Sequence, residues 1–321
     1  MSMFTRSRTT LAALVILALA IPAGAAEVNK FLPDDTDAVL VLNVKQLLNS
    51  PLVQKHALEE LKTMLKGNSE ATKHLEALGF DPFKDLTSVT LAVCITKGEP
   101  KALMIAQGDF DMAKFEHKAE DLMKEKPGML KVTKEGKFKI YELKTEQGGD
   151  KPGYFGAPDL HTIVASNQKE YVVNALGKSD GKRPSIKKEL EELITKADAN
   201  QSLWFAVPGS SLLNSEAAGS PDGKKFIEKL DSVRGGVSIN RDVKMAVDFV
   251  AKGADGAKEL AEMLQGYLDQ AKGLLAVLAG DKKELAAAVG IIESMKVETS
   301  GNNVSLKAEA SESALEKSLK K

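Results

Sequence analysis

The sequence predicts an α+β protein built from two duplicated ferredoxin-like lobes, each an antiparallel sheet with helices packed on one face. Strand-like runs and helical stretches follow the same order in both halves of the chain, and the segment LLNS occurs at 47–50 and again at 212–215. Strands that alternate over one apolar face and are joined by short turns favour antiparallel sheets. A chain of 321 residues is long enough for two domains.

Hydrophobic periodicity predicts the elements of the first half in the order β-α-β-β-α-β-β-α. Asp111 is placed to cap the second of its helices. The predicted strands cover 37–44, 88–96, 101–109, 137–144 and 160–166, and the helical segments cover 51–78 (with a break near Gly67), 112–125 and 168–177.

The second half repeats this order. A shift of 165 positions places 38–50 on 203–215 without a gap, which predicts an internal repeat with lobes at 26–180 and 181–321. Its predicted strands cover 202–209, 232–240, 244–252 and a hairpin within 294–311, and its predicted helices include 185–197, 224–230, two segments after 254 and the C-terminal residues.

The first 25 residues have the pattern of a cleaved signal peptide. Arg6 and Arg8 precede an uncharged apolar run, and Ala23-Gly24-Ala25 supplies the small residues that a signal peptidase accepts. Cleavage is expected after Ala25, with residues 26–31 disordered in the mature chain. The protein is therefore predicted to be extracytoplasmic, either periplasmic or secreted; the alternative is an uncleaved membrane anchor.

Composition narrows the class of protein. Lys and Arg number 44 against 45 Asp and Glu, interleaved along the chain, so no basic surface for nucleic acid is predicted. Cys94 is the only cysteine, which excludes an intramolecular disulfide and favours a bacterial envelope over a eukaryotic secreted domain. Its strand-like surroundings predict a buried, unreactive thiol.

No pattern of catalytic or metal-binding residues stands out. His117 and Asp121 are four residues apart and could share a helix face, but a solvated charged face is the commoner explanation. The acid clusters at 34–37 and 109–116 are interpreted as turn and capping residues. We expect no catalytic residues, no cofactor and no metal ligand, although carboxylates distant in sequence could meet in the fold.

Two features could serve binding. Tyr154 and Phe155 lie in the Gly- and Pro-rich segment 145–159, which could present them to a partner or fold them back over the sheet edge. The helix from Ala254 carries an apolar stripe at helical spacing, which is typical of a core-facing helix but could also contact a membrane. The stripe consists of Ala257, Leu260, Ala261, Leu264, Leu268, Ala271, Leu275 and Leu278.

The runs DDTDAVLVLNVKQLLNSPLVQKH (34–56) and LGFDPFKDLTSVTLAV (78–93) resemble an uncharacterised family of secreted two-repeat proteins of planctomycete-type bacteria. The resemblance implies an exported α+β protein without an assigned reaction, and it supplies no site residues.

The sequence therefore favours an exported, non-enzymatic envelope protein, a binding or structural module whose partner is an unknown protein or small ligand. One alternative is an extracytoplasmic hydrolase that uses carboxylates assembled between the lobes. Another is a membrane-surface or lipid-binding protein, for which the long helix would have to expose its stripe.

Overall fold

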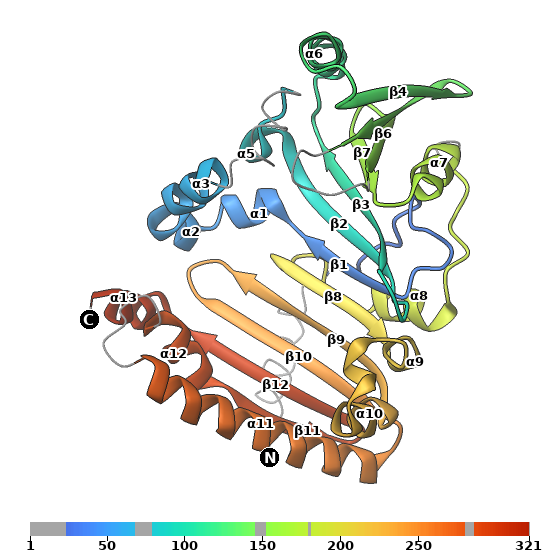
Figure 1. Ribbon diagram of the computed structural model, residues 1–321. Coiled ribbons are helices and arrows are strands. Elements are labelled where there is room, and N and C mark those ends of the chain that lie inside the picture. Colours follow the sequence, from blue (N-terminus) through green and yellow to red (C-terminus); the bar gives the residue numbers. More distant parts are fainter. Residues whose placement is uncertain (1–23, 68–78, 145–151, 179–180, 280–285, 321) are drawn as a thin grey trace, which may run out of the picture.

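The computed structural model describes residues 24–67, 79–144, 152–178, 181–279 and 286–320, and twelve strands of this part form one antiparallel sheet (Figure 1). Their order across the sheet is β11-β12-β10-β9-β8-β1-β2-β3-β7-β6-β5-β4. The strands are β1 (Ala38–Leu42), β2 (Leu86–Cys94), β3 (Lys101–Gly108), β4 (Leu130–Glu135), β5 (Phe138–Leu143), β6 (Gly153–Asp159), β7 (Thr162–Ser166), β8 (Leu203–Pro208), β9 (Leu230–Ile239), β10 (Val243–Ala251), β11 (Lys296–Ser300) and β12 (Asn303–Ala310).

The helices largely follow the predicted segments, and α6 covers the same residues as its prediction. They are α1 (Val44–Leu48), α2 (Pro51–His56), α3 (Leu58–Gly67), α5 (Pro82–Asp85), α6 (Met112–Glu125), α7 (Lys169–Gly177), α8 (Lys188–Thr195), α9 (Gly209–Leu212), the 3-10 helix η3 (Glu216–Gly219), α10 (Pro221–Glu228), α11 (Ala254–Ala279), α12 (Ala286–Ser294) and α13 (Glu312–Lys320).

The two halves of the chain share this sheet because β1 pairs with β8. Val39 lies opposite Ala206 and Leu42 opposite Leu203 in an antiparallel register. The predicted α+β class and antiparallel pairing are confirmed, but the expectation of separate ferredoxin-like lobes needs correction. A ferredoxin-like lobe inserts a strand between the two that its first helix connects, whereas β1 and β2 are direct antiparallel neighbours.

Two strands, β4 and β6, escaped the sequence prediction. β4 forms a hairpin with β5 around Gly136, whose φ of +59° suits a tight turn. The signal for this hairpin was present as alternating residues on either side of Glu135-Gly136. β6 carries two glycines and a proline, a composition typical of a loop, yet it is held between β5 and β7.

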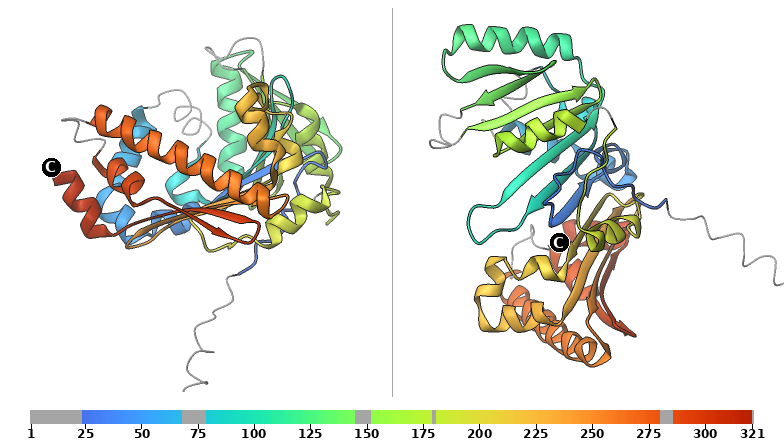
Figure 2. Two further views of the ribbon diagram at one scale, coloured as in Figure 1. Left: turned by 90° about the horizontal axis from the view of Figure 1, so that it is seen from below. Right: turned by 90° about the vertical axis from the view of Figure 1, so that its right-hand side faces the viewer.

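Helices cover both faces of the sheet rather than one (Figure 2). The face that carries Val39, Ile105 and Val164, called here the first face, is buried under α7, α8 and the N-terminal segment. The opposite, second face is covered at its two ends. There α11 packs against β8 to β12, and α6 packs against β4 to β6.

The segment after the predicted cleavage site is ordered, which corrects the expected disorder of residues 26–31. Ala26, Phe31 and Leu32 are each at most 5% exposed and belong to the core of the first face. The Ala26 N–H donates to the Ala197 oxygen at 3.1 Å. Burial of two large apolar side chains anchors the segment.

The helix α2 begins with a side-chain cap. Ser50 Oγ accepts from the Val53 N–H, and Pro51 is the first helical residue. The second LLNS copy is followed by η3, after which Ser220 and Pro221 start α10 in the same way. Asp111 caps α6, as predicted, by accepting from Lys114.

Asp37, just before β1, is 5% exposed and fully engaged. Its carboxylate accepts from the Ile95 N–H at 2.8 Å, from Ser211 Oγ at 2.9 Å and from Lys187 Nζ at 2.5 Å. Burial alone would raise the pKa of Asp37, but these three donors together hold it below its usual value. Asp37 thus ties β1 and β2 to residues of the second half.

Replacement of Asp37 by Asn is expected to lower the free energy of unfolding at pH 7 by about 2 kcal/mol, because hydrogen bonds to a charged acceptor are lost. The lowered pKa means that the carboxylate stabilises the fold above its unfolded pKa of 3.8 and stops doing so as the pH falls through its folded pKa. Urea unfolding between pH 7 and 3 should show the gap between variant and wild type narrowing below about pH 4. A gap that stays constant would contradict this role.

Candidate functional site

A row of directly opposed residues runs across the second face, with one residue from each of the twelve strands. Cross-strand partners lie on the same face of a sheet. The row therefore crosses the second face from edge to edge, and the packing of each of its residues shows which parts of that face are covered. From β4 to β11 the row consists of Val132, Tyr141, Phe155, Ala165, Met104, Leu91, Leu40, Phe205, Gly235, Val247, Leu306 and Val297.

Among the described residues, helices cover the two ends of this row but not its middle. Val132, Tyr141 and Phe155 pack in the cluster under α6. Phe205, Val247 and Val297 pack against the cluster under α11. The four residues between them belong to neither cluster and form what we call the apolar strip: Ala165, Met104, Leu91 and Leu40.

The apolar strip is open to solvent. Leu40 is 38% exposed and Met104 39% exposed, and Leu91 and Ala165 are partly exposed. The first face behind it is closed, since Val39, Leu103 and Ile105 on the same strands are at most 3% exposed. Neighbouring apolar residues left exposed in the middle of a sheet are a candidate interaction surface.

The strip spans four neighbouring strands, β7, β3, β2 and β1. At about 4.8 Å between strands, this leaves roughly 20 Å of sheet between the covered regions. An α-helix with its side chains is about 10 Å across, so the space can hold a helix laid on the sheet between the flanking elements. The walls come from opposite halves of the chain, with Phe155 at one side and Phe205 at the other.

Tyr154 and Phe155, the predicted partner contacts, lie in β6 rather than in a loop. Their rings occupy opposite faces of the sheet. Tyr154 packs against the core of the first face. Phe155 stacks on Tyr141 with ring centroids 5.0 Å apart and meets Phe115 edge-on at 5.9 Å. The predicted loop presentation is therefore corrected, and Phe155 borders the apolar strip.

The stripe of α11 faces the core. Ala257, Leu260, Leu264 and Leu268 are between 0% and 9% exposed, while Ala271 is exposed and the Leu278 side chain lies outside the described residues. The membrane-surface alternative needed this stripe exposed, and these four buried residues are not available to a membrane, whereas Ala261 and Leu275 are partly exposed. Among the described residues, no helix is both long and apolar enough to cross a membrane.

The surroundings of Cys94 and of the acid cluster at 34–37 indicate structural roles for these residues. Burial, with the nearby charges of Asp35 and Asp37, raises the pKa of the Cys94 thiol, so the reactive thiolate is disfavoured at neutral pH. Asp34 accepts from Lys178 Nζ at 2.8 Å, and Asp35 accepts from the Tyr171 hydroxyl at 2.6 Å. These contacts join the segment before β1 to α7 and its C-terminal end.

His117 and Asp121 do share a face of α6. Their closest side-chain atoms are 3.7 Å apart, and the His117 side chain is 73% exposed. Lys124 lies 3.8 Å from the same carboxylate. This is the solvated charged face that the sequence favoured.

Comparison with known proteins assigns no family. No protein-family model matches the chain, and no curated protein matches it. Two solved structures, of crystal forms I and IV of TP0453, align with 12% and 10% identity over 92% and 93% of this chain and 98% of theirs. Their TM-scores of 0.47 and 0.48 establish neither a shared fold nor a shared function.

Truncation of Phe155 to Ala is expected to destabilise the protein by about 3 kcal/mol, because the ring packs between Tyr141 and α6. Leu160 is the matched control, since it lies in the next turn and is 65% exposed. Leu160→Ala should change the melting temperature little. Equal effects of the two substitutions in thermal unfolding would contradict the packing role of Phe155.

Proposed function

We propose that this protein is an exported, non-enzymatic binding protein that uses the apolar strip to hold an amphipathic helix of a partner protein. The observation that carries the proposal is the middle of the second face, which no helix of the described residues covers and where Leu40 and Met104 are exposed. A helix laid there would complete the helical layer.

The shape of the strip favours a helix over a small ligand. Small-molecule sites are enclosed and bury most of the ligand, whereas Leu40 and Met104 lie on an open sheet surface. An amphipathic helix presents apolar residues at i, i+3, i+4 and i+7, which suits an apolar surface flanked by walls. Phe155 and Phe205 supply aromatic side chains at the two margins of the strip.

Export rests on the N-terminal pattern. The sequence supports cleavage after Ala25, and residues 1–23 lie outside the described residues. The fold is compatible with cleavage after Ala25, because Ala26 and the residues after it make their own core contacts. The predicted relation to secreted two-repeat proteins of planctomycete-type bacteria stays a prediction.

An origin by duplication is part of the proposal. Outward from the central pair, the first half runs β1-β2-β3-β7-β6 and the second runs β8-β9-β10-β12-β11. A helix follows the third strand of each series, α6 after β3 or α11 after β10, and another follows the fourth, α7 after β7 or α13 after β12. The shared order supports one ancestral unit, to which the first half has added the β4–β5 hairpin.

Amino-terminal sequencing of protein recovered from the envelope or medium of the producing cell should begin at Ala26. A mature chain that begins at Met1 and stays in the cytoplasm would contradict export, and with it the proposed class of partner.

The strip is tested by photocrosslinking residues placed at Leu40 and Met104 in the producing cell, with Leu160 as the exposed apolar control. The partner crosslinked from the strip, once purified, should bind wild type, and Leu40→Asp or Met104→Asp should weaken binding at least ten-fold, about 1.4 kcal/mol. Leu160→Asp should bind like wild type.

Two results would contradict the helix-binding function. One is a partner that binds the Asp variants as tightly as wild type while their melting temperatures are unchanged. The other is strip-dependent binding of wild type to phospholipid vesicles with no protein crosslinked, which would favour the membrane-surface alternative.

A further inference from the structure

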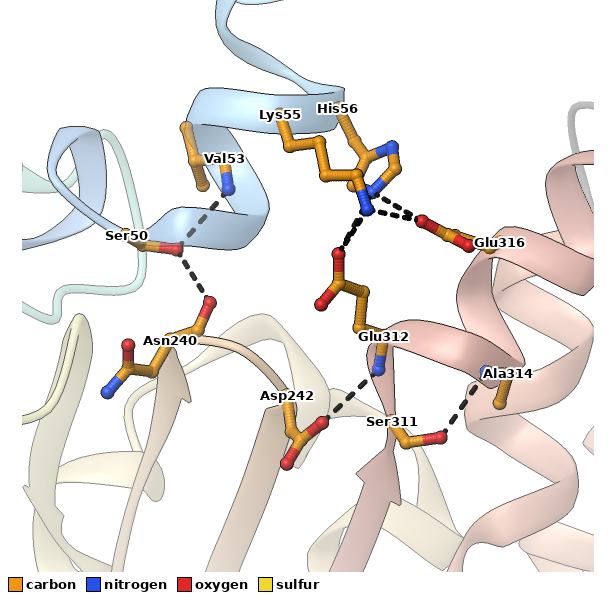
Figure 3. A network of polar contacts seen from close by, with 10 residues as sticks. All are labelled: Ser50, Val53, Lys55, His56, Asn240, Asp242, Ser311, Glu312, Ala314 and Glu316. Atoms are coloured by element: carbon orange, nitrogen blue, oxygen red, sulfur yellow. Dashed lines mark hydrogen bonds and ion pairs between the residues drawn. The ribbon is translucent and has the colours of Figure 1, made fainter.

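A histidine and two glutamates from opposite ends of the chain meet beside the β9–β10 hairpin (Figure 3). His56 ends α2, while Glu312 and Glu316 lie one turn apart at the start of α13. His56 Nε2 lies 3.6 Å from Glu312 Oε1 and 3.4 Å from Glu316 Oε1. One ligand atom from each residue falls within 4.8 Å of the others.

These separations suit a tetrahedral zinc ion. Zinc binds histidine nitrogen and carboxylate oxygen at about 2.0–2.2 Å, so two ligands of one tetrahedral ion lie about 3.3–3.6 Å apart. Both measured distances from Nε2 fall in that interval. Three protein ligands would leave a fourth position for water, as in open zinc sites.

His56 Nε2 is independently unusual, because it is buried and has no hydrogen-bond partner. A buried polar atom without a close hydrogen-bond partner is unfavourable. The atom is aimed at the two carboxylates and lies at ion-pair distance from both, with no contact shorter than 3.4 Å. A metal ion between nitrogen and oxygens would give it the missing partner.

The helices that carry the three side chains are positioned by one hairpin turn. Ser50, the cap of α2, donates through Oγ to the Asn240 oxygen at 3.0 Å, and the Leu52 N–H donates to the same oxygen. Asp242 accepts from the Glu312 N–H at 3.2 Å. The hairpin thus sets the spacing of the three side chains before any ion arrives, which reduces the entropy lost on binding.

The ammonium group of Lys55 lies against the two carboxylates, where a metal ion would bind. Its ammonium group lies 2.7 Å from Glu312 and 2.6 Å from Glu316, and its hydrogen bond to Glu312 holds the pKa of that carboxyl below its usual value. The Lys55 side chain is 57% exposed, so it can swing into solvent. The two carboxylates carry two negative charges. The ammonium group of Lys55 neutralises one of them, whereas a zinc ion would neutralise both.

We propose that His56, Glu312 and Glu316 bind one zinc ion, which displaces the Lys55 ammonium group and links α2 to α13. The site depends on neither the apolar strip nor its partner. A bound ion would hold α13 against α2.

Calorimetric titration of zinc into the purified mature chain, in a non-chelating buffer at pH 7.5, tests this site. One ion should bind, and His56→Gln or Glu316→Gln should weaken binding roughly ten-fold or more. Lys55→Met should tighten binding, because it removes the competing cation while keeping a side chain of similar length. Cobalt(II) should give the visible absorption of a tetrahedral site.

His117→Gln and His161→Gln are matched controls, because each of these histidines lies near one aspartate elsewhere on the surface. Both variants should bind zinc like wild type. The proposal is overturned if zinc produces no heat with wild type or Lys55→Met, or if His56→Gln binds as tightly as wild type. It is also overturned if a control substitution removes the binding, or if magnesium and calcium bind as tightly as zinc.

Discussion

The pairing of β1 with β8 is the interaction on which the rest of the structure depends. It joins two series of strands into one sheet, and Asn43 extends the join by donating its N–H to the Ser202 oxygen at 2.8 Å. The register places Leu40 opposite Phe205 and Val39 opposite Ala206. A slip of one residue would turn Leu40 into the buried core and expose Val39, because side chains alternate between faces.

Once the sheet is joined, the two halves are covered on different sides. In the first half, the N-terminal segment, α7 and α8 close the first face. In the second half, α11 closes the second face. The predicted boundary at 180/181 does not separate two cores, because Leu190 of α8 and Trp204 of β8 pack with Val172 of α7. The apolar strip lies where the helical cover changes from the first face to the second, and it includes Leu40 of β1, one strand of the central pair.

The turn between β9 and β10 also organises the fold, because it contacts the starts of both α2 and α13. Asn240 and Asp242 accept backbone or side-chain donors from the starts of α2 and α13, so two short helices far apart in sequence are fixed to one support. Helix starts have N–H groups without helical partners, and these acceptors satisfy some of them. The contact between Lys55 and Glu312 spans 257 residues of chain and follows from that shared support.

Signals within short segments of the sequence were enough to predict several helices and most strands. The periodicity of 112–125 gave α6, Ser50-Pro51 and Ser220-Pro221 gave two helix starts, and alternating runs gave most of the strands. The burial of Leu260, Leu264 and Leu268 also followed from spacing alone. These features depend on residues within one or two turns of each other, and one sequence contains that information.

Only the tertiary structure decided which strands are neighbours, which face each helix covers and which polar side chains meet. β6 is a strand despite its glycines and proline because β5 and β7 flank it, and Ala26 and Phe31 are ordered because α8 and the sheet enclose them. Leu40 is exposed because no helix of the described chain covers the middle of the second face. Such outcomes depend on contacts between different helices and strands, some of them more than a hundred positions apart, and periodicity and spacing carry no record of those contacts.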